Sequence, residues 1–277
     1  MNARQLFNQI REKGSYLCIG LDSDYNRIPK FLLDAEYPLF EFNKLIVKAT
    51  ADLAVAYKPN LAFYESLGTA GWMSLELTVN FIRSNYPELF IVADAKRGDI
   101  GNTSRLYASA FYNHMDFDAV TVAPYMGRDS VTPFLQYNEK WVILLGLTSN
   151  EGAEDFQLLK INGKKHYLFE QVFQTAAEWG NTDNLMFVVG ATRPEWMKKI
   201  RKIVPDHFLL VPGIGAQGGN LEDISMHGLN KQGGLLVNSS RAIIYADITN
   251  KFDVAARDKA AEIKAEMETY LKKKKIL

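Results

Sequence analysis

The densest group of reactive side chains in this sequence lies in the segment Asp94-Ala95-Lys96-Arg97-Gly98-Asp99. It follows an apolar run, so two carboxylates and an ammonium stand where a buried strand is predicted to end. Charged groups in such a place need mutual pairing or a ligand, because burying an unpaired charge is costly. Residues i and i+2 of an extended segment share a face, so Asp94 and Lys96 can point into the same space.

Two interpretations of these charges remain open at this point. They form either a site that acts on a polar ligand or an ion-pair network that only fixes the rim of the fold. We favour the first interpretation, because buried ion pairs return less stability than their desolvation costs.

Eight short apolar runs recur along the chain, and each has the length and composition of a buried strand. They are rich in Val, Ile, Leu and Phe and lack the alternation of a half-exposed strand, which indicates cover on both faces. Longer segments with helical spacing separate them, such as Phe40–Ala51 and Ser104–His114. The apolar runs are Tyr16–Leu21, Ala54–Lys58, Phe90–Ala93, Ala119–Ala123, Val142–Leu147, Met186–Gly190, Phe208–Pro212 and Leu235–Asn238.

This repeated alternation predicts a parallel sheet closed into a (β/α)8 barrel, the TIM-barrel class of α/β fold. An open doubly wound sheet is the alternative. The chain has 277 residues, and α/β barrels often fill about 250 residues as one domain. We therefore expect a single domain over residues 1–277, closed by a helix over Ala255–Lys275, with its site at the carboxyl ends of the strands.

The composition excludes several classes of protein. Lys and Arg total 32, as do Asp and Glu, so the net charge is zero and non-specific nucleic-acid binding is not expected. The single cysteine, Cys18, excludes a disulfide scaffold, and no cluster of His, Cys and acidic residues has metal-ligand spacing. No run has the length of a membrane span and no secretory signal is evident, so we expect a cytoplasmic protein.

Polar residues after the last two predicted strands indicate an anion site. The seventh strand is followed by the glycine-rich segment Gly213–Gly219, which contains Gln217, and the eighth by Ser240 and Arg241. Glycines let backbone N–H groups approach an anion, and an arginine offers a bidentate fork. A simple turn with a surface-paired arginine is the plainer alternative. The two loops together favour phosphate, which TIM barrels commonly bind there.

The segment Asp94-x-Lys96-x-x-Asp99, with Thr103 beyond it, resembles the signature of the orotidine 5′-phosphate decarboxylase family, and its extended form resembles the type 2 bacterial branch. Related barrels that act on sugar phosphates share part of this motif, so the later loops make the resemblance specific. The similarity covers essentially the whole chain and includes Gly20-Leu21-Asp22, Tyr57-Lys58-Pro59-Asn60, the segment Pro212–Gly219 and Ser240-Arg241.

The resemblance implies a homodimeric barrel without metal or organic cofactor that converts orotidine 5′-monophosphate to UMP and CO2. By position, Lys96 would protonate C6 as CO2 leaves, next to Asp94. Asp99 and Thr103 would reach into the partner's site. The implied substrate-binding residues are Asp22 and Lys58 at the ribose, Ser149 (or Thr148) at the pyrimidine, Gln217 and Arg241 with neighbouring Ser240 at the phosphate, and Pro212 at the base of the closing loop.

These residue types suit the implied chemistry. Loss of CO2 from C6 leaves an electron pair that the ring delocalises poorly, so the site must stabilise negative charge electrostatically. A fixed ammonium does this and then supplies the proton. Two other functions remain open: a sugar-phosphate decarboxylase, isomerase or aldolase on the same barrel, and a non-catalytic nucleotide sensor.

Overall fold

Eight parallel strands close into a barrel in chain order in this computed structural model, with β8 paired to β1. The structure describes residues 1–161, 166–191, 194–213 and 220–277. Each of the eight predicted apolar runs contributes a strand, which confirms the closed barrel over the open sheet. The strands are β1 (Leu17–Leu21), β2 (Ala56–Pro59), β3 (Phe90–Arg97), β4 (Ala119–Val122), β5 (Trp141–Leu147), β6 (Leu185–Val189), β7 (Leu209–Pro212) and β8 (Leu235–Ser239).

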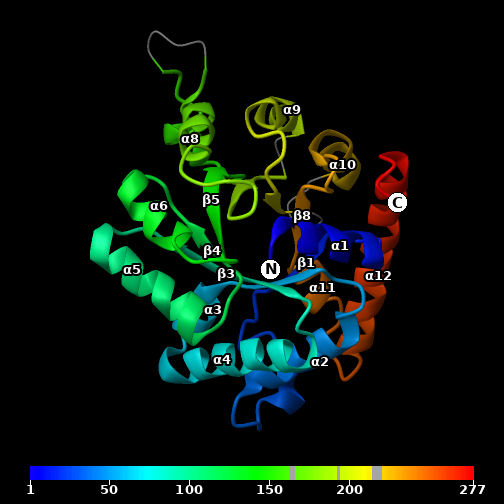
Figure 1. The fold of residues 1–277 in the computed structure, drawn as a ribbon. Helices are drawn as coiled ribbons and strands as arrows, with labels where there is room; N and C mark the ends of the chain where they lie inside the picture. Colours follow the sequence, from blue (N-terminus) through cyan, green and yellow to red (C-terminus); the bar gives the residue numbers. More distant parts are fainter. Residues whose placement is uncertain (162–165, 192–193, 214–219) are drawn as a thin grey trace.

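Helices surround the barrel, and the long helix α12 packs along its outside against α2, α10 and α11 (Figure 1). This element confirms the predicted closing helix, with slightly different ends. None of the helices in the described ranges is both long and apolar enough to cross a bilayer. The helices are α1 (Ala3–Lys13), η1 (Lys30–Leu32), α2 (Pro38–Thr50), α3 (Leu61–Glu65), α4 (Gly68–Asn85), α5 (Gly101–Ser109), η2 (Ala110–His114), α6 (Arg128–Leu135), α7 (Ala153–Phe156), α8 (Leu168–Ala176), α9 (Pro194–Ile203), α10 (Leu221–Gly228), α11 (Arg241–Ile244) and α12 (Phe252–Lys273).

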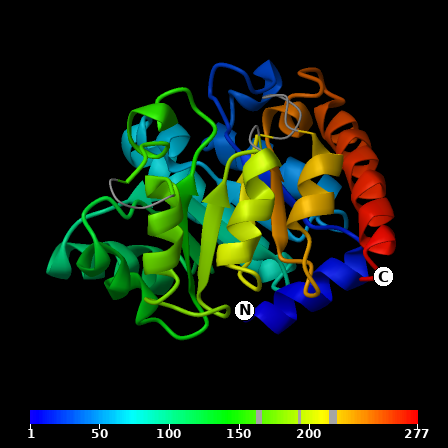
Figure 2. The same ribbon diagram turned by 90° about the horizontal axis from the view of Figure 1, so that it is seen from above.

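Aromatic side chains fill the barrel at the end where the strands begin. The Trp141 ring lies edge-on to Phe90 and to Phe208, with ring centroids 6.2 Å apart in each pair. Phe90 and Trp141 begin β3 and β5, and Phe208 directly precedes β7. Alternate strands supply one layer of a barrel core. Helix α1 lies outside the same end (Figure 2). The packed base leaves the carboxyl ends of the strands as the open side.

Strand β3 is longer than the sequence predicts. It does not end at Ala93 but continues through the charged segment to Arg97. Its register against β4 shifts between Ala93 and Arg97, and Lys96 has a φ of 46°, in the left-handed region. The strand carries charges this far because each is paired: Asp94 with Lys96 and with Lys58 of β2, and Arg97 with Glu65 of α3.

Candidate active site

Three charged side chains from two neighbouring strands meet at the carboxyl end of the barrel. The Asp94 carboxylate lies between two ammonium groups: Lys96 Nζ is 2.6 Å from Oδ1, and Lys58 Nζ is 2.7 Å from Oδ2. Lys58 is buried on β2, whereas the Lys96 side chain is 52% exposed. The predicted contact between residues i and i+2 is therefore present. The buried ammonium anchors the carboxylate, and the carboxylate holds the exposed ammonium.

The electrostatics favour the charged forms of Asp94 and Lys58. Burial alone would raise the pKa of Asp94, but the two ammonium groups outweigh it and hold this pKa well below its usual value. Burial would likewise lower the pKa of Lys58, yet Asp94 and Asp22 raise it above its ordinary value. The Lys96 ammonium is therefore the charged group of this cluster that faces solvent.

Thr121 completes the cluster, and the sequence analysis did not identify it. Its hydroxyl donates to Asp94 Oδ1 at 3.1 Å and accepts from the backbone N–H of Lys96 at 2.9 Å. The residue is buried on β4 and fixes both the carboxylate and the lysine backbone. A single polar residue inside the apolar run of a predicted strand was the signal that marked it.

Asp22 directly follows β1 and faces the same cluster. Its Oδ1 lies 3.9 Å from Lys58 Nζ, is shielded from solvent and accepts no hydrogen bond from the described residues. Buried carboxylate oxygens are normally satisfied by donors. This oxygen is therefore a vacant acceptor for a hydroxyl or amide of a ligand.

A buried polar network holds the loop that begins at Asp22. Ser23 donates to the side chain of Asn43 at 2.6 Å, and Asn43 donates to the hydroxyl of Tyr64 at 2.9 Å. The hydroxyl of Tyr245 accepts from the backbone N–H of Asp24 at 2.6 Å. Because helices α2 and α3 and the end of α11 all bind this loop, the vacant acceptor is held rigidly.

A cavity of about 330 Å³ opens beside the charges, within the range of small-molecule sites, about 300–1,000 Å³. One wall is charged and the opposite wall is apolar. Pro212, the last residue of β7, lines it, and its predicted place at the base of a closing loop stays a prediction. The other lining residues are Lys58, Asp94, Lys96, Thr121, Leu145, Thr148, Ser149, Asn150, Val188 and Leu210.

Thr148 and Ser149 both line this cavity. The hydroxyl of Thr148 donates to Asn150 Oδ1 at 2.6 Å and accepts from the Gln157 amide at 2.9 Å. Thr148 is thus engaged in holding its own loop. Ser149, with Thr148 as the alternative, stays the predicted pyrimidine contact.

Asp99 and Thr103 do not join the charged cluster within one chain. Asp99 Oδ1 accepts a hydrogen bond from the backbone N–H of Ile100 at 2.7 Å. Among the described residues, Asp99 forms no ion pair. Thr103 is exposed on the first turn of α5. Their predicted role in a partner's site stays a prediction.

The predicted phosphate residues lie at the end of β8. Ser240 donates to the backbone oxygen of Gly20 at 3.0 Å, which ties β8 to β1. Arg241 begins α11 and is exposed, and its guanidinium makes no hydrogen bond or ion pair with the residues that the structure describes. Gln217 lies outside the described residues. Gly213, just before that segment, has a φ of 99°, which suits glycine.

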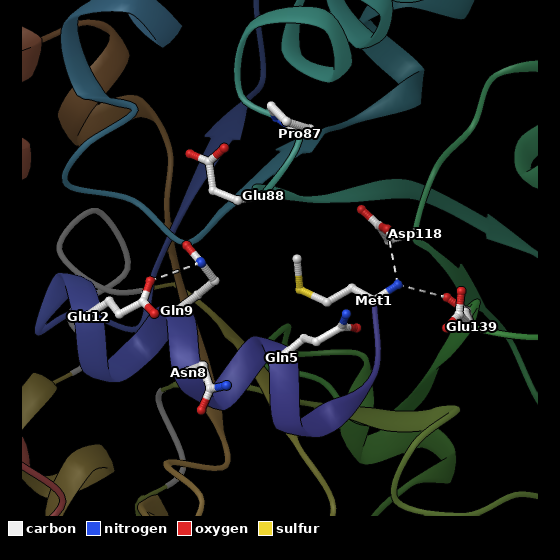
Figure 3. A pocket seen from close by; sticks show the side chains of 9 residues that line it. All are labelled: Met1, Gln5, Asn8, Gln9, Glu12, Pro87, Glu88, Asp118 and Glu139. Atoms are coloured by element: carbon white, nitrogen blue, oxygen red, sulfur yellow. Dashed lines mark hydrogen bonds and ion pairs between the residues drawn. The ribbon is translucent and has the colours of Figure 1, made fainter.

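A second cavity, of about 380 Å³, lies at the opposite end of the barrel, where the strands begin (Figure 3). Its walls are α1 and the segments that precede β3, β4 and β5. Met1 extends across it, and its amine donates to the backbone oxygen of Glu139 at 3.2 Å. This cavity shares no residue with the charged cluster. Across the described ranges, no group of three or more His, Cys, Asp and Glu residues is arranged to hold a metal ion.

The sequence is similar to that of known proteins over almost its whole length. A family model described as "Orotidine 5'-phosphate decarboxylase / HUMPS family" matches residues 15–255. The orotidine 5'-phosphate decarboxylase of Phocaeicola vulgatus is 59% identical over 269 residues, covering 97% of this chain and 98% of that protein.

Solved structures agree with this family match. Leishmania donovani OMP decarboxylase has 35% identity and a TM-score of 0.81, over 97% of this chain and 100% of that chain. Leishmania donovani UMP synthase has 36% identity and a TM-score of 0.81, over 94% of this chain and 56% of that chain. The chain therefore belongs to the orotidine 5'-phosphate decarboxylase / HUMPS family.

Proposed function

We propose that this chain decarboxylates orotidine 5′-monophosphate to UMP and CO2, the last step of de novo UMP synthesis, with Lys96 as the proton donor. The family match and the 59% identical decarboxylase support the reaction. The observation that carries the mechanism is the Asp94 carboxylate, 2.6 Å from Lys96 Nζ and 2.7 Å from Lys58 Nζ. A sensor that only binds a nucleotide does not need such a costly array of charges. The array therefore supports an enzyme over a sensor.

In the proposed reaction, the bond between C6 and the carboxylate breaks and its electron pair stays on C6. The Lys96 ammonium, beside C6, stabilises this charge and then transfers a proton to C6. Lys96 becomes a neutral amine and regains a proton from solvent through its exposed side. Asp94, 2.6 Å from the ammonium, holds it in place before the reaction.

The same geometry supports a binding pose for the nucleotide. The vacant Oδ1 of Asp22 would accept a ribose hydroxyl, with the Lys58 ammonium next to it. Ser149 would contact the pyrimidine, against the apolar wall of Leu145, Val188 and Leu210. Arg241, Ser240 and Gln217 would bind the phosphate. Phosphate held far from C6 gives binding energy that preorganises the site, and this appears as rate.

We also propose that the active form is a homodimer and that residues 1–277 act as a single domain in the cytoplasm. Apolar side chains gather on α5 and on the loop after β4: Leu106 is 64% exposed, Tyr125 is 88% exposed and Ile100 is 56% exposed. Exposed apolar patches of this kind mark protein interfaces. Asp99 and Thr103 lie on the same segment, so a second copy here would bring them to the partner's cavity.

Ultraviolet absorbance tests the function directly, because orotidylate and UMP absorb differently. Purified protein mixed with orotidine 5′-monophosphate should produce a steady change in absorbance, and EDTA should not stop it. Binding without any spectral change would instead indicate the nucleotide sensor. Loss of this activity in EDTA would contradict the expected reaction without a metal ion.

A further inference from the structure

The side chain of Arg97, the last residue of β3, takes no part in the proposed reaction or in the proposed binding of the nucleotide. Its Nη1 donates to the backbone oxygen of Ala95 at 3.0 Å, and its Nη2 forms an ion pair with Glu65 at the end of α3. The guanidinium also lies over two rings of the following helices, 5.3 Å from the centroid of Tyr107 and 5.5 Å from that of Phe111. Four groups, one each from β3, α3, α5 and η2, therefore hold one side chain.

The residue before it needs such support. Lys96 has a φ of 46°, a conformation that side-chain-bearing residues adopt only when their surroundings impose it. Thr121 fixes the N–H of Lys96, and the backbone oxygen of Arg97 accepts from the N–H of Ala123 at 2.8 Å. Backbone contacts thus hold the strand at both sides of Lys96. The anchored side chain of Arg97 adds a third attachment directly after Lys96.

The Lys96 side chain has little else to fix it. It is 52% exposed, and among the described residues its Nζ contacts only Asp94. A lysine with four rotatable bonds loses considerable freedom when it is held by one contact. Its position over the cavity therefore depends on the direction in which its backbone aims it.

We propose that the Arg97–Glu65 pair is a positioning device for Lys96: it maintains the left-handed backbone that aims the ammonium at Asp94 and the cavity. The pair acts through Lys96 and does not touch the substrate. This inference rests on the proposed function for its kinetic consequences, but its structural consequence is independent of it.

Two variants test the proposal. Arg97→Met keeps a long side chain that can lie over the two rings but removes the charge. Glu65→Gln keeps the side-chain volume but removes the ion pair. Both should lower kcat for orotidine 5′-monophosphate at least about tenfold, while KM and the inhibition constant of UMP stay within about twofold, because substrate contacts are unchanged. The double variant should lose about as much as Arg97→Met alone, since both changes break one device.

A matched pair elsewhere is the control. Arg257 on α12 binds Asp52 at 2.7 and 2.8 Å, far from the cavity. The variants Arg257→Met and Asp52→Asn remove the same kind of interaction and should leave kcat unchanged. Thermal unfolding of each variant establishes the folded fraction to which kcat is referred.

A crystal structure of Arg97→Met, or of Glu65→Gln if the first variant does not fold, gives the readout that needs no activity. We expect Lys96 to leave the left-handed region and its Nζ to leave Asp94. The proposal is overturned if Lys96 in the variant keeps its left-handed backbone and its contact with Asp94. It is also overturned if folded variants retain wild-type kcat. If the wild-type protein does not decarboxylate orotidylate, the proposed function fails, and the crystal structure still decides the positioning role.

Discussion

Asp94 is the residue on which the other charges of the site depend. It accepts from Lys96, Lys58 and the hydroxyl of Thr121, so nearly all its acceptor capacity is used. A carboxylate in this state stays ionised although it is largely buried, because its partners compensate the lost hydration. Its charge in turn raises the pKa of Lys58 and holds the Lys96 ammonium at the same point.

This arrangement predicts how stability depends on pH. Because the pKa of Asp94 is lowered in the folded protein, its stabilising effect is complete above its unfolded pKa of about 4 and is lost as pH falls further. The variant Asp94→Asn should therefore lower the free energy of unfolding most at pH 7, by about 3 kcal/mol, and progressively less below pH 4. Urea unfolding between pH 7 and pH 3 measures this difference.

Asp52→Asn is the control for this experiment, because Asp52 belongs to an exposed pair with Arg257. Exposed pairs contribute little to stability, so the variant should differ only slightly from the wild-type protein at every pH. A loss in Asp94→Asn that is the same at all pH values would show that the charge of Asp94 does not contribute in the folded state.

Arg241 should act on binding. Replacing it by alanine removes a charge-assisted contact to the phosphate, so KM for orotidine 5′-monophosphate should rise about 10- to 100-fold. Orotidine, which has no phosphate, is the internal control: its kcat/KM should be the same in the wild-type and variant enzymes. Equal losses for both compounds would place the effect of Arg241 somewhere other than the phosphate.

For individual residues, the sequence predicts contacts within one strand better than contacts between strands. The meeting of Asp94 and Lys96 follows from the two-residue period of an extended chain. Thr121 was missed because its contact with Asp94 depends on the register of β4 against β3, and this register shifts near Ala93. No spacing along the chain encodes such a shift.

Strand ends and the loops after them set the shape of the cavity. Gly190, just after β6, lies against Ser149 in the loop after β5: a Cβ at Gly190 would stand 2.7 Å from the Ser149 nitrogen and 2.9 Å from its Cα. Real Cβ atoms do not approach backbone so closely. The absence of a side chain at Gly190 thus lets Ser149 lie at the cavity wall.

The variant Gly190→Ala should therefore push the Ser149 backbone outward. We expect KM to rise about tenfold and the free energy of unfolding to fall by about 1–3 kcal/mol, as for other overpacked sites. Gly152→Ala, in the same loop region, is the control, because its nearest neighbour is the flexible end of the Asn150 side chain at 3.3 Å. An unchanged KM in folded Gly190→Ala would separate Ser149 from substrate binding.

The elements themselves were largely predictable, and the exceptions have physical reasons. Buried strands of a closed barrel must be apolar along their length, so the eight runs were visible in the sequence. The short helices α3, α7 and α11 were not predicted, because four or five residues carry too little periodicity. The extension of β3 to Arg97 was hidden because isolated charges normally end a strand.

At the scale of the whole molecule, the predicted site residues fall into two separate places on one chain. Asp94, Lys96, Lys58 and Asp22 lie together, whereas Asp99 and Thr103 lie beside the exposed apolar side chains of α5. A homodimer that buries this surface would complete two sites at once, as two-fold symmetry requires. The sequence indicates such a dimer only through the family resemblance, because no spacing along one chain encodes a contact between two copies.

Subunit mixing tests the dimer. A hybrid of Asp99→Ala and Lys96→Ala chains has one site with an intact Lys96 and a partner's intact Asp99, so a fully exchanged equimolar mixture should recover about a quarter of wild-type activity. Asp94→Ala mixed with Lys96→Ala is the control: these two residues are in contact within one chain, so no hybrid site is complete. No recovery in the first mixture, with exchange demonstrated by mass spectrometry, would contradict a partner role for Asp99.

The most direct test of the account is the turnover of Lys96→Ala with orotidine 5′-monophosphate, measured by absorbance beside the affinity of the same variant for UMP. Removing the ammonium takes away both the stabilising charge and the proton, so kcat should fall by at least about 10⁴-fold. UMP should still bind, because Asp22, Lys58 and Arg241 remain. A folded Lys96→Ala enzyme with near wild-type kcat would contradict the central claim.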